Sequence, residues 1–207
     1  MRKGMQKRVV LWLAVVGALL PMPPQLRAAA LQSDSEQVPR VSLAEISGNP
    51  GASVMMPLSL TPDPKNPLRS LTVDIEYVSN SLIFQKASRG LAAELANADI
   101  QTSLTEGKPD DKGLKRAKLR ITASLPEPNP KDGLPHGLLA YLLFQVSPDA
   151  KPFLITLTPT VVSANDLSTP PKAVANVGAK PGVVSVESLD ATYDRLAPAV
   201  ACFFFTH

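Results

Sequence analysis

The sequence predicts an all-β fold, an antiparallel β-sandwich with one short helix. From Val41 onward, apolar and polar residues alternate in short segments, which is typical of strands with one buried face. Clusters of Gly, Pro, Asn and Asp separate these segments at the regular spacing expected of a sandwich. One stretch, "LAAELANA" from Leu91 to Ala98, is rich in Ala and Leu without a breaker and predicts the helix.

The alternation predicts nine strands in chain order. We expect them near residues 41–47, 53–60, 68–78, 82–87, 99–105, 114–124, 137–147, 153–163 and 182–188. Between the sixth and seventh strands, "PEPNPKDGLPHG" from Pro126 to Gly137 reads as a stiff proline-rich connection.

Residues 1–30 have the layout of a secretory signal peptide. A basic start is followed by an apolar run of 12 residues, Val9 to Leu20, and by small residues that end at Ala30. We therefore expect a secreted or cell-envelope protein with no stable membrane anchor after cleavage, with a retained N-terminal anchor as the alternative. Residues 31–40 are polar and read as a leader, and residues 189–207 as a C-terminal tail.

Removing the signal peptide reverses the sign of the net charge. Residues 1–30 hold five of the 21 basic residues and none of the 18 acidic ones, which leaves 16 against 18, a net charge of −2. This balance gives no indication of nucleic-acid binding. The remaining 177 residues fit one domain with its own core. Because Cys202 is the single cysteine, the chain cannot form an internal disulfide.

The sequence offers little for catalysis or metal binding. Its two histidines are His136, in the proline-rich connection, and His207. Neither belongs to a motif for nucleophilic catalysis, and Cys202 has no zinc-ligand spacing around it. Asp110 and Asp111 are adjacent and do not repeat the ligand spacing of a calcium-binding loop. We therefore expect a protein that is not an enzyme and holds no metal or cofactor.

The aromatic residues weigh against a sugar-binding platform, which usually uses exposed Trp. The single Trp, Trp12, lies in the signal peptide. Tyr77 shares the parity of the apolar residues on its strand, so we expect its ring in the core. Tyr141 and Tyr193 remain as candidates for the surface. Three phenylalanines in apolar segments are expected in the core as well: Phe84, Phe144 and Phe153.

Four stretches resemble the cohesin domain family when taken in order. They are "SGNPGASVMMPLSL", "LTVDIEYVSNSLIFQKASRG", "GLLAYLLFQVSPDAKPFLITLTPTVVSANDL" and "GAKPGVVSV". The resemblance covers residues 41–188 and implies a nine-stranded jelly-roll sandwich, an architecture shared with several carbohydrate-binding modules. It also implies a non-catalytic module, which in the best-known members binds a dockerin on one sheet.

Two predicted strands place charges on one outer face. On the third strand Leu71, Val73, Ile75 and Tyr77 are expected to point inward, and on the sixth Leu119, Ile121 and Ala123. The resemblance makes these strands neighbours in the sheet that receives the dockerin. Their outward residues form an acidic row beside a basic row, which serves either a partner or an ordinary cross-strand ladder. We call this set the charged face: Thr72, Asp74, Glu76, Lys118, Arg120 and Thr122.

The second and seventh strands, neighbours in a jelly roll, place apolar residues on the other outer face. On the seventh strand we expect Ala140, Leu142, Phe144 and Val146 to point inward. An apolar patch of this kind indicates a covering element. The candidates are the segment Phe203–Phe205, the helix at 91–98, or another protein. We call this set the apolar face: Met55, Pro57, Leu139, Tyr141 and Leu143.

Taken together, the sequence favours an exported, non-catalytic interaction module that binds a protein partner, either dockerin-like or a component of an envelope or scaffold. The alternative is a carbohydrate-binding module of the same architecture, acting in polysaccharide binding or breakdown.

The signal-peptide layout makes a prediction about maturation. Because the small-residue site ends at Ala30, the exported protein should begin at Leu31. N-terminal sequencing of the secreted form checks this. A membrane-bound protein that still carries Met1 would contradict it.

Overall fold

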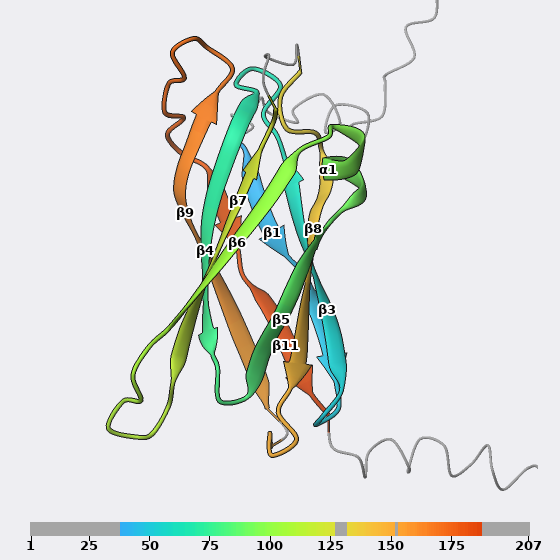
Figure 1. Ribbon diagram of the computed structural model, residues 1–207, viewed down its shortest axis with the longest axis vertical. Coiled ribbons are helices and arrows are strands. Elements are labelled where there is room, and N and C mark those ends of the chain that lie inside the picture. Colours follow the sequence, from blue (N-terminus) through green and yellow to red (C-terminus); the bar gives the residue numbers. More distant parts are fainter. Residues whose placement is uncertain (1–37, 127–131, 152, 188–207) are drawn as a thin grey trace, which may run out of the picture. The chain divides into compact units, whose positions relative to one another are not determined.

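The computed structural model describes residues 38–126, 132–151 and 153–187, which form a sandwich of two β-sheets (Figure 1). One sheet has five strands in the order β10-β1-β3-β8-β5, and the other has six in the order β2-β11-β9-β4-β7-β6. The elements are β1 (Arg40–Leu43), β2 (Glu45–Gly48), β3 (Ser53–Thr61), β4 (Leu68–Val78), β5 (Leu82–Arg89), α1 (Leu91–Leu95), β6 (Asp99–Glu106), β7 (Arg116–Ser124), β8 (Gly137–Val146), β9 (Leu154–Asp166), β10 (Gly178–Lys180) and β11 (Gly182–Val186).

The predicted all-β sandwich is confirmed, but the described residues contain eleven strands rather than nine. The first predicted strand breaks at Ala44, where the chain passes from β1 in one sheet to β2 in the other. The last predicted strand, at 182–188, corresponds to β11 and is preceded by the additional strand β10. Between them the chain changes sheets again at Pro181, which has no N–H to continue a ladder. Because both crossings occur side by side, β1 pairs in parallel with β10 and β2 with β11. The sheets are therefore mixed and not purely antiparallel.

The predicted helix is present but shorter. It ends at Leu95 because Asn97 adopts a left-handed conformation, with a φ of 52°. The N–H of Ala98 then bonds back to the carbonyl of Ala93 at 2.8 Å, which closes the helix and directs the chain into β6. In the described part of the chain, no helix is long and apolar enough to cross a membrane.

The inward-pointing residues predicted for β4, β7 and β8 all lie in the core. Phe144 is at its centre, where it makes edge-to-face contacts with Tyr77 at 5.3 Å and with Phe84 at 5.6 Å. The prediction for Phe153 was wrong, since its side chain is 41% exposed. Phe153 precedes β9, which begins at Leu154, so the alternation of that strand does not govern it.

The expectation that Leu139 points outward was also wrong. Along β3 and β8, Leu58 lies opposite Ala140, whereas the next residue, Ser59, lies opposite Leu138. Leu139 is therefore the extra residue of a β-bulge, and its carbonyl accepts a hydrogen bond from the N–H of Gly90 at 2.8 Å. As a result Leu139 and Ala140 are both buried, with Leu139 only 1% exposed.

Because of this bulge, Leu139 is buried and Tyr141 is exposed, although the alternation in the sequence places both residues on the same outer face. Leu139→Asp should lower the free energy of unfolding by more than about 4 kcal/mol, because it buries an unpaired carboxylate. Tyr141→Asp, on the exposed side of the same strand, should cost about 1 kcal/mol. Urea denaturation of both variants measures the difference. Equal losses would contradict the burial of Leu139.

Candidate functional site

The structure brings the six residues of the charged face together on the outer side of the six-stranded sheet. β4 and β7 are neighbours, and their register sets three cross-strand pairs: Thr72 with Thr122, Asp74 with Arg120, and Glu76 with Lys118. The two threonine hydroxyls are 3.3 Å apart. Each acidic side chain thus lies directly opposite a basic one.

Asp74 and Arg120 form a bidentate ion pair at the centre of this face. The Arg120 guanidinium donates from Nε to Oδ1 of Asp74 at 2.7 Å and from Nη2 to Oδ2 at 2.9 Å. Asp74 is 6% exposed although it points outward, whereas Arg120 is half exposed and lies over it. Two parallel charge-assisted bonds of this kind fix both side chains in one orientation.

The ion pair shifts the pKa values of both side chains. The hydrogen bonds from Arg120 lower the pKa of Asp74 below its ordinary value of 3.8, against the opposing effect of burial. The same hydrogen bonds raise the pKa of Arg120. Both groups are therefore charged at neutral pH.

Glu76 and Lys118 form a second ion pair, more exposed than the first. The Lys118 Nζ lies 3.1 Å from Oε1 of Glu76, and both side chains are about half exposed. Water and salt screen such a pair strongly. Because the four charges are paired within the face, they cancel one another at a distance. The charged face therefore exerts little long-range electrostatic attraction.

Hydroxyl and amide side chains flank the ion pairs on both sides. One row across the sheet runs from Thr160 on β9 through Asp74 and Arg120 to Ser103 on β6. Both flanking strands were predicted, but their outward residues were not assigned to the charged face, although the alternation in "LITLTPT" contains the signal. The flanking exposed residues are Thr156, Thr158, Thr160, Gln101, Ser103 and Thr105.

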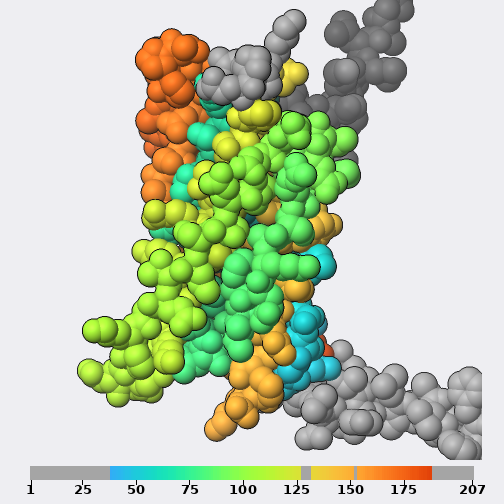
Figure 2. Space-filling view, in the orientation of Figure 1, coloured from blue at the N-terminus to red at the C-terminus, as the bar shows by residue number. Residues whose placement is uncertain are grey.

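A shallow hollow lies at one end of the charged face. It encloses about 310 Å³ and is lined by Glu76, Thr105, Gly107, Arg116, Ala117 and Lys118. The hollow borders the start of the β6–β7 hairpin, which projects from the sandwich at the lower left of Figure 2. It provides a concave surface beside the Glu76–Lys118 pair.

The apolar face consists of four of the five predicted residues. In the register of β3 and β8, Met55 lies opposite Leu143 and Pro57 opposite Tyr141, whereas Leu139 belongs to the core. Met55 is 54% exposed and Tyr141 37%, so α1 does not cover them. The segment Phe203–Phe205 lies outside the described residues.

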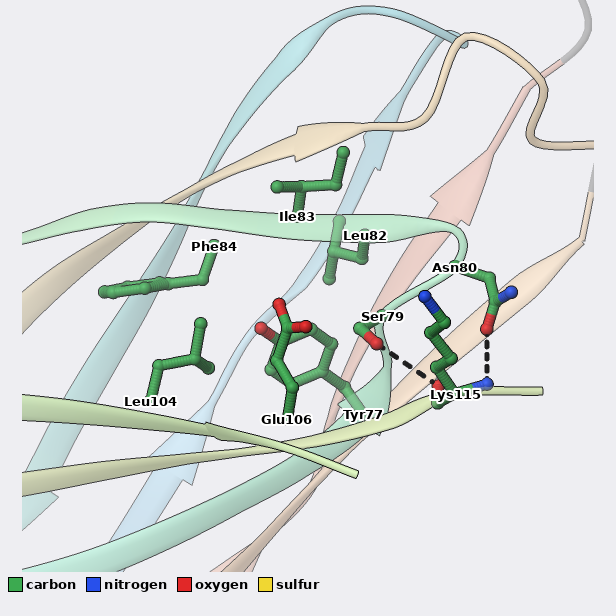
Figure 3. Close-up of a pocket in the computed structure, with 9 residues that line it drawn as sticks. All are labelled: Tyr77, Ser79, Asn80, Leu82, Ile83, Phe84, Leu104, Glu106 and Lys115. Carbon is green, nitrogen blue, oxygen red and sulfur yellow. Dashed lines mark hydrogen bonds between the residues drawn. The ribbon is translucent and has the colours of Figure 1, made fainter. Parts of the chain in front are cut away.

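A cavity of about 190 Å³ opens between the edge strands β5 and β6 (Figure 3). Its apolar wall includes Phe84 and Leu104, and Glu106 lies beside the ring of Tyr77. Burial raises the pKa of Tyr77 to about 12, partly offset by a backbone hydrogen bond with Phe84. The Tyr77 hydroxyl therefore stays protonated and is no general base at neutral pH.

In the described ranges, no three His, Cys, Asp or Glu side chains gather into a group that could hold a metal ion. The carboxylate of Asp110 instead closes its own loop. Its Oδ1 accepts hydrogen bonds from the backbone N–H groups of Lys112 at 2.9 Å and Leu114 at 2.8 Å. His136 is exposed on the approach to β8.

The topology defines a class, the two-sheet jelly-roll sandwich. Comparison with known proteins narrows this class further. No family model and no curated protein matches the sequence. Among solved structures, the third ScaC cohesin of Acetivibrio cellulolyticus, in complex with a ScaB dockerin variant, is similar with a TM-score of 0.58 and 21% identity. That match covers 72% of this chain and 99% of the cohesin.

Two further structures agree with this result. The seventh ScaB type I cohesin of Pseudobacteroides cellulosolvens has a TM-score of 0.55 and 16% identity, covering 73% of this chain and 93% of that one. A non-cellulosomal cohesin of the archaeon Archaeoglobus fulgidus has a TM-score of 0.52 and 14% identity, covering 77% and 98%. The chain has a cohesin-like fold, as the sequence resemblance implied.

The Asp74–Arg120 pair predicts a pH-dependent contribution to stability. Because the folded-state pKa of Asp74 is lowered, the pair stabilises the fold above the ordinary value of 3.8. This contribution is lost as the pH falls through the lowered folded-state value. Asp74→Asn should therefore destabilise the protein most at neutral pH, and the two proteins should converge in acid.

Urea denaturation from pH 7 down to pH 2 measures this convergence. Arg120→Gln serves as the matched variant, because it removes the other half of the same pair. It leaves a mostly buried, unpaired carboxylate, so its loss of stability at neutral pH should be at least as large, and protonation of Asp74 in acid should remove this loss as well. A stability difference between wild type and Asp74→Asn that is constant with pH would contradict the prediction.

Proposed function

We propose that this protein is an exported, non-catalytic interaction module that binds a protein partner through the outer face of the six-stranded sheet. The partner is a dockerin-like module. The contact surface comprises the charged face and its flanking hydroxyl rows on β9 and β6.

The likeness of the fold to cohesins carries this proposal. The similar ScaC cohesin was solved together with a dockerin, which supports a protein as the ligand class for a sandwich of this topology. The predicted signal peptide supports an extracytoplasmic location, where a secreted or envelope-bound partner would meet the module.

The physical character of the face favours a polar contact. Its central ion pairs already satisfy each other, so a partner need not supply counter-charges for them. Around them, Thr and Ser hydroxyls can each donate and accept hydrogen bonds without the ordering cost of long side chains. Such a surface suits a polar protein surface better than a membrane or an apolar ligand.

The polysaccharide alternative receives less support. Sugar platforms use coplanar exposed aromatic rings, and the exposed aromatics among the described residues are Tyr141 and Phe153. Tyr141 is on β8 of the five-stranded sheet, whereas Phe153 precedes β9 of the six-stranded one. The two rings therefore do not form one stacking surface.

Binding of a dockerin panel that includes the Acetivibrio cellulolyticus ScaB dockerin tests the proposal. Thr160→Arg places a bulky charge beside the Asp74–Arg120 pair and should weaken binding by at least about tenfold. Tyr141→Arg, on the opposite sheet, is the matched control and should bind like wild type. Thermal unfolding verifies that both variants are folded.

Two results would overturn the proposal. Capture of no dockerin in the panel would remove the dockerin-like partner. Loss of binding with Tyr141→Arg but not with Thr160→Arg would move the contact to the apolar face. Reversing the central charges with Asp74→Lys and Glu76→Lys adds a salt test, since their effect should be largest at low ionic strength.

A further inference from the structure

Among the described residues the sandwich has four edge strands, and three of them are protected against pairing with another strand. β10 has three residues and β2 has four, which is too short to act as a template. β5 carries a register shift between Phe84 and Lys86, and the exposed Lys86 and Arg89 lie along it. Bulges, basic residues and short length are the usual ways in which proteins block an edge.

The fourth edge strand, β6, has none of these protections. It runs for eight residues, "DIQTSLTE", without Pro, Gly, Lys or Arg. Its pairing with β7 is continuous from Asp99 to Glu106 with no register shift. All of its residues except Ile100 are exposed, and Figure 2 shows this lime-green strand on the surface facing the viewer.

The hydrogen bonding of the hairpin shows which backbone groups lie on the free edge. Gly107, the residue after β6, donates its N–H to the carbonyl of Arg116 at 2.7 Å. Hydrogen-bonded pairs alternate along an antiparallel ladder, so the odd-numbered residues of β6 bond to β7. The N–H and C=O groups of Ile100, Thr102 and Leu104 therefore point away from the sheet.

We propose that β6 is a self-association edge: it pairs antiparallel with β6 of a second copy of this chain, with Thr102 opposite Thr102 on the two-fold axis. This register places Ile100 opposite Leu104 of the second copy and forms about six backbone hydrogen bonds, two for each of three pairs. Pairing ends there because the N–H of Ala98 is already bonded to Ala93.

The side chains of β6 are self-complementary in this register. Ile100 and Leu104 lie on the inner side, opposite the core residues Ala123 and Leu119 of β7. Leu104, now 41% exposed beside the cavity of Figure 3, would gain an apolar cross-strand neighbour. Asp99 would face Thr105, so no like charges stand opposite each other. In the alternative register with Ser103 on the two-fold axis, the apolar side chain of Ile100 would lie opposite the charged side chain of Glu106.

The dimer would join the two six-stranded sheets into one continuous sheet. Directly opposite residues of an antiparallel pair project to the same side, so both charged faces would be presented on one surface. Two linked sites on one surface raise the avidity for a bivalent partner. The proposal does not rest on the identity of that partner, because it uses the free backbone edge of β6.

Single cysteines test the register directly, in the whole chain with Cys202→Ser. Thr102→Cys should form a disulfide-linked dimer on oxidation, because the two-fold axis brings the two positions to within disulfide distance. Ser103→Cys is the matched control, and it should not cross-link, since Ser103 would face Gln101. Cross-linking of Ser103→Cys as readily as Thr102→Cys, or of neither, would overturn the proposal.

Light scattering over a concentration series measures association without a cross-link. The mass should rise toward twice that of the monomer, and Thr102→Lys, which sets two like charges on the axis, should keep the chain monomeric and folded. Ile100→Lys and Leu104→Glu should each abolish the dimer, and the double variant should restore it through opposite charges. A wild-type chain that stays monomeric at every concentration would overturn the proposal.

Discussion

The inward alternation of β4 is the constraint on which the rest of the structure depends. This strand is central in the six-stranded sheet, and its inner residues from Leu71 to Tyr77 are almost fully buried. A slip of one residue would turn this entire set outward and bring Asp74 into the core. The cost of such a slip fixes the register of β4 against β7, and this register brings Asp74 opposite Arg120. The geometry of the outer face is thus set by packing on the inner face.

The same constraint decides which features could be predicted from the sequence. On β4, β7 and β8 the two-residue period is unbroken over most of each strand, and their buried residues followed from it. The bulge at Leu139 could not be predicted, because it depends on the register with β3 and on the N–H of Gly90, which is distant in the sequence. The crossings at Ala44 and Pro181 were missed for a similar reason. Each is visible only once the pairing of β1 with β10 and of β2 with β11 is known.

The two outer faces differ in how they can bind. On the apolar face, Met55 and Tyr141 offer surface whose burial gains roughly 25 cal/mol per Å², without directional requirements. On the charged face, the bidentate Asp74–Arg120 pair holds both side chains in place, and the hydroxyls around it require matching donors and acceptors. The sequence predicted which charges share this face, and the cross-strand ladder that it offered as one interpretation is present as the two ion pairs. The apolar face therefore suits contacts that are not directional, and the charged face suits contacts that are.

The pairing of β6 with β7 links the charged face to the unprotected edge of β6. Its eight consecutive pairs place Ser103 beside Arg120 and Thr105 beside Lys118, which extends the hydroxyl surface to the border of the sheet. A bulge in β6 would protect its edge, as the bulge in β5 does, but it would also change which side chains point outward beyond it. The regular outer face and the unprotected edge are thus two consequences of the same unbroken strand.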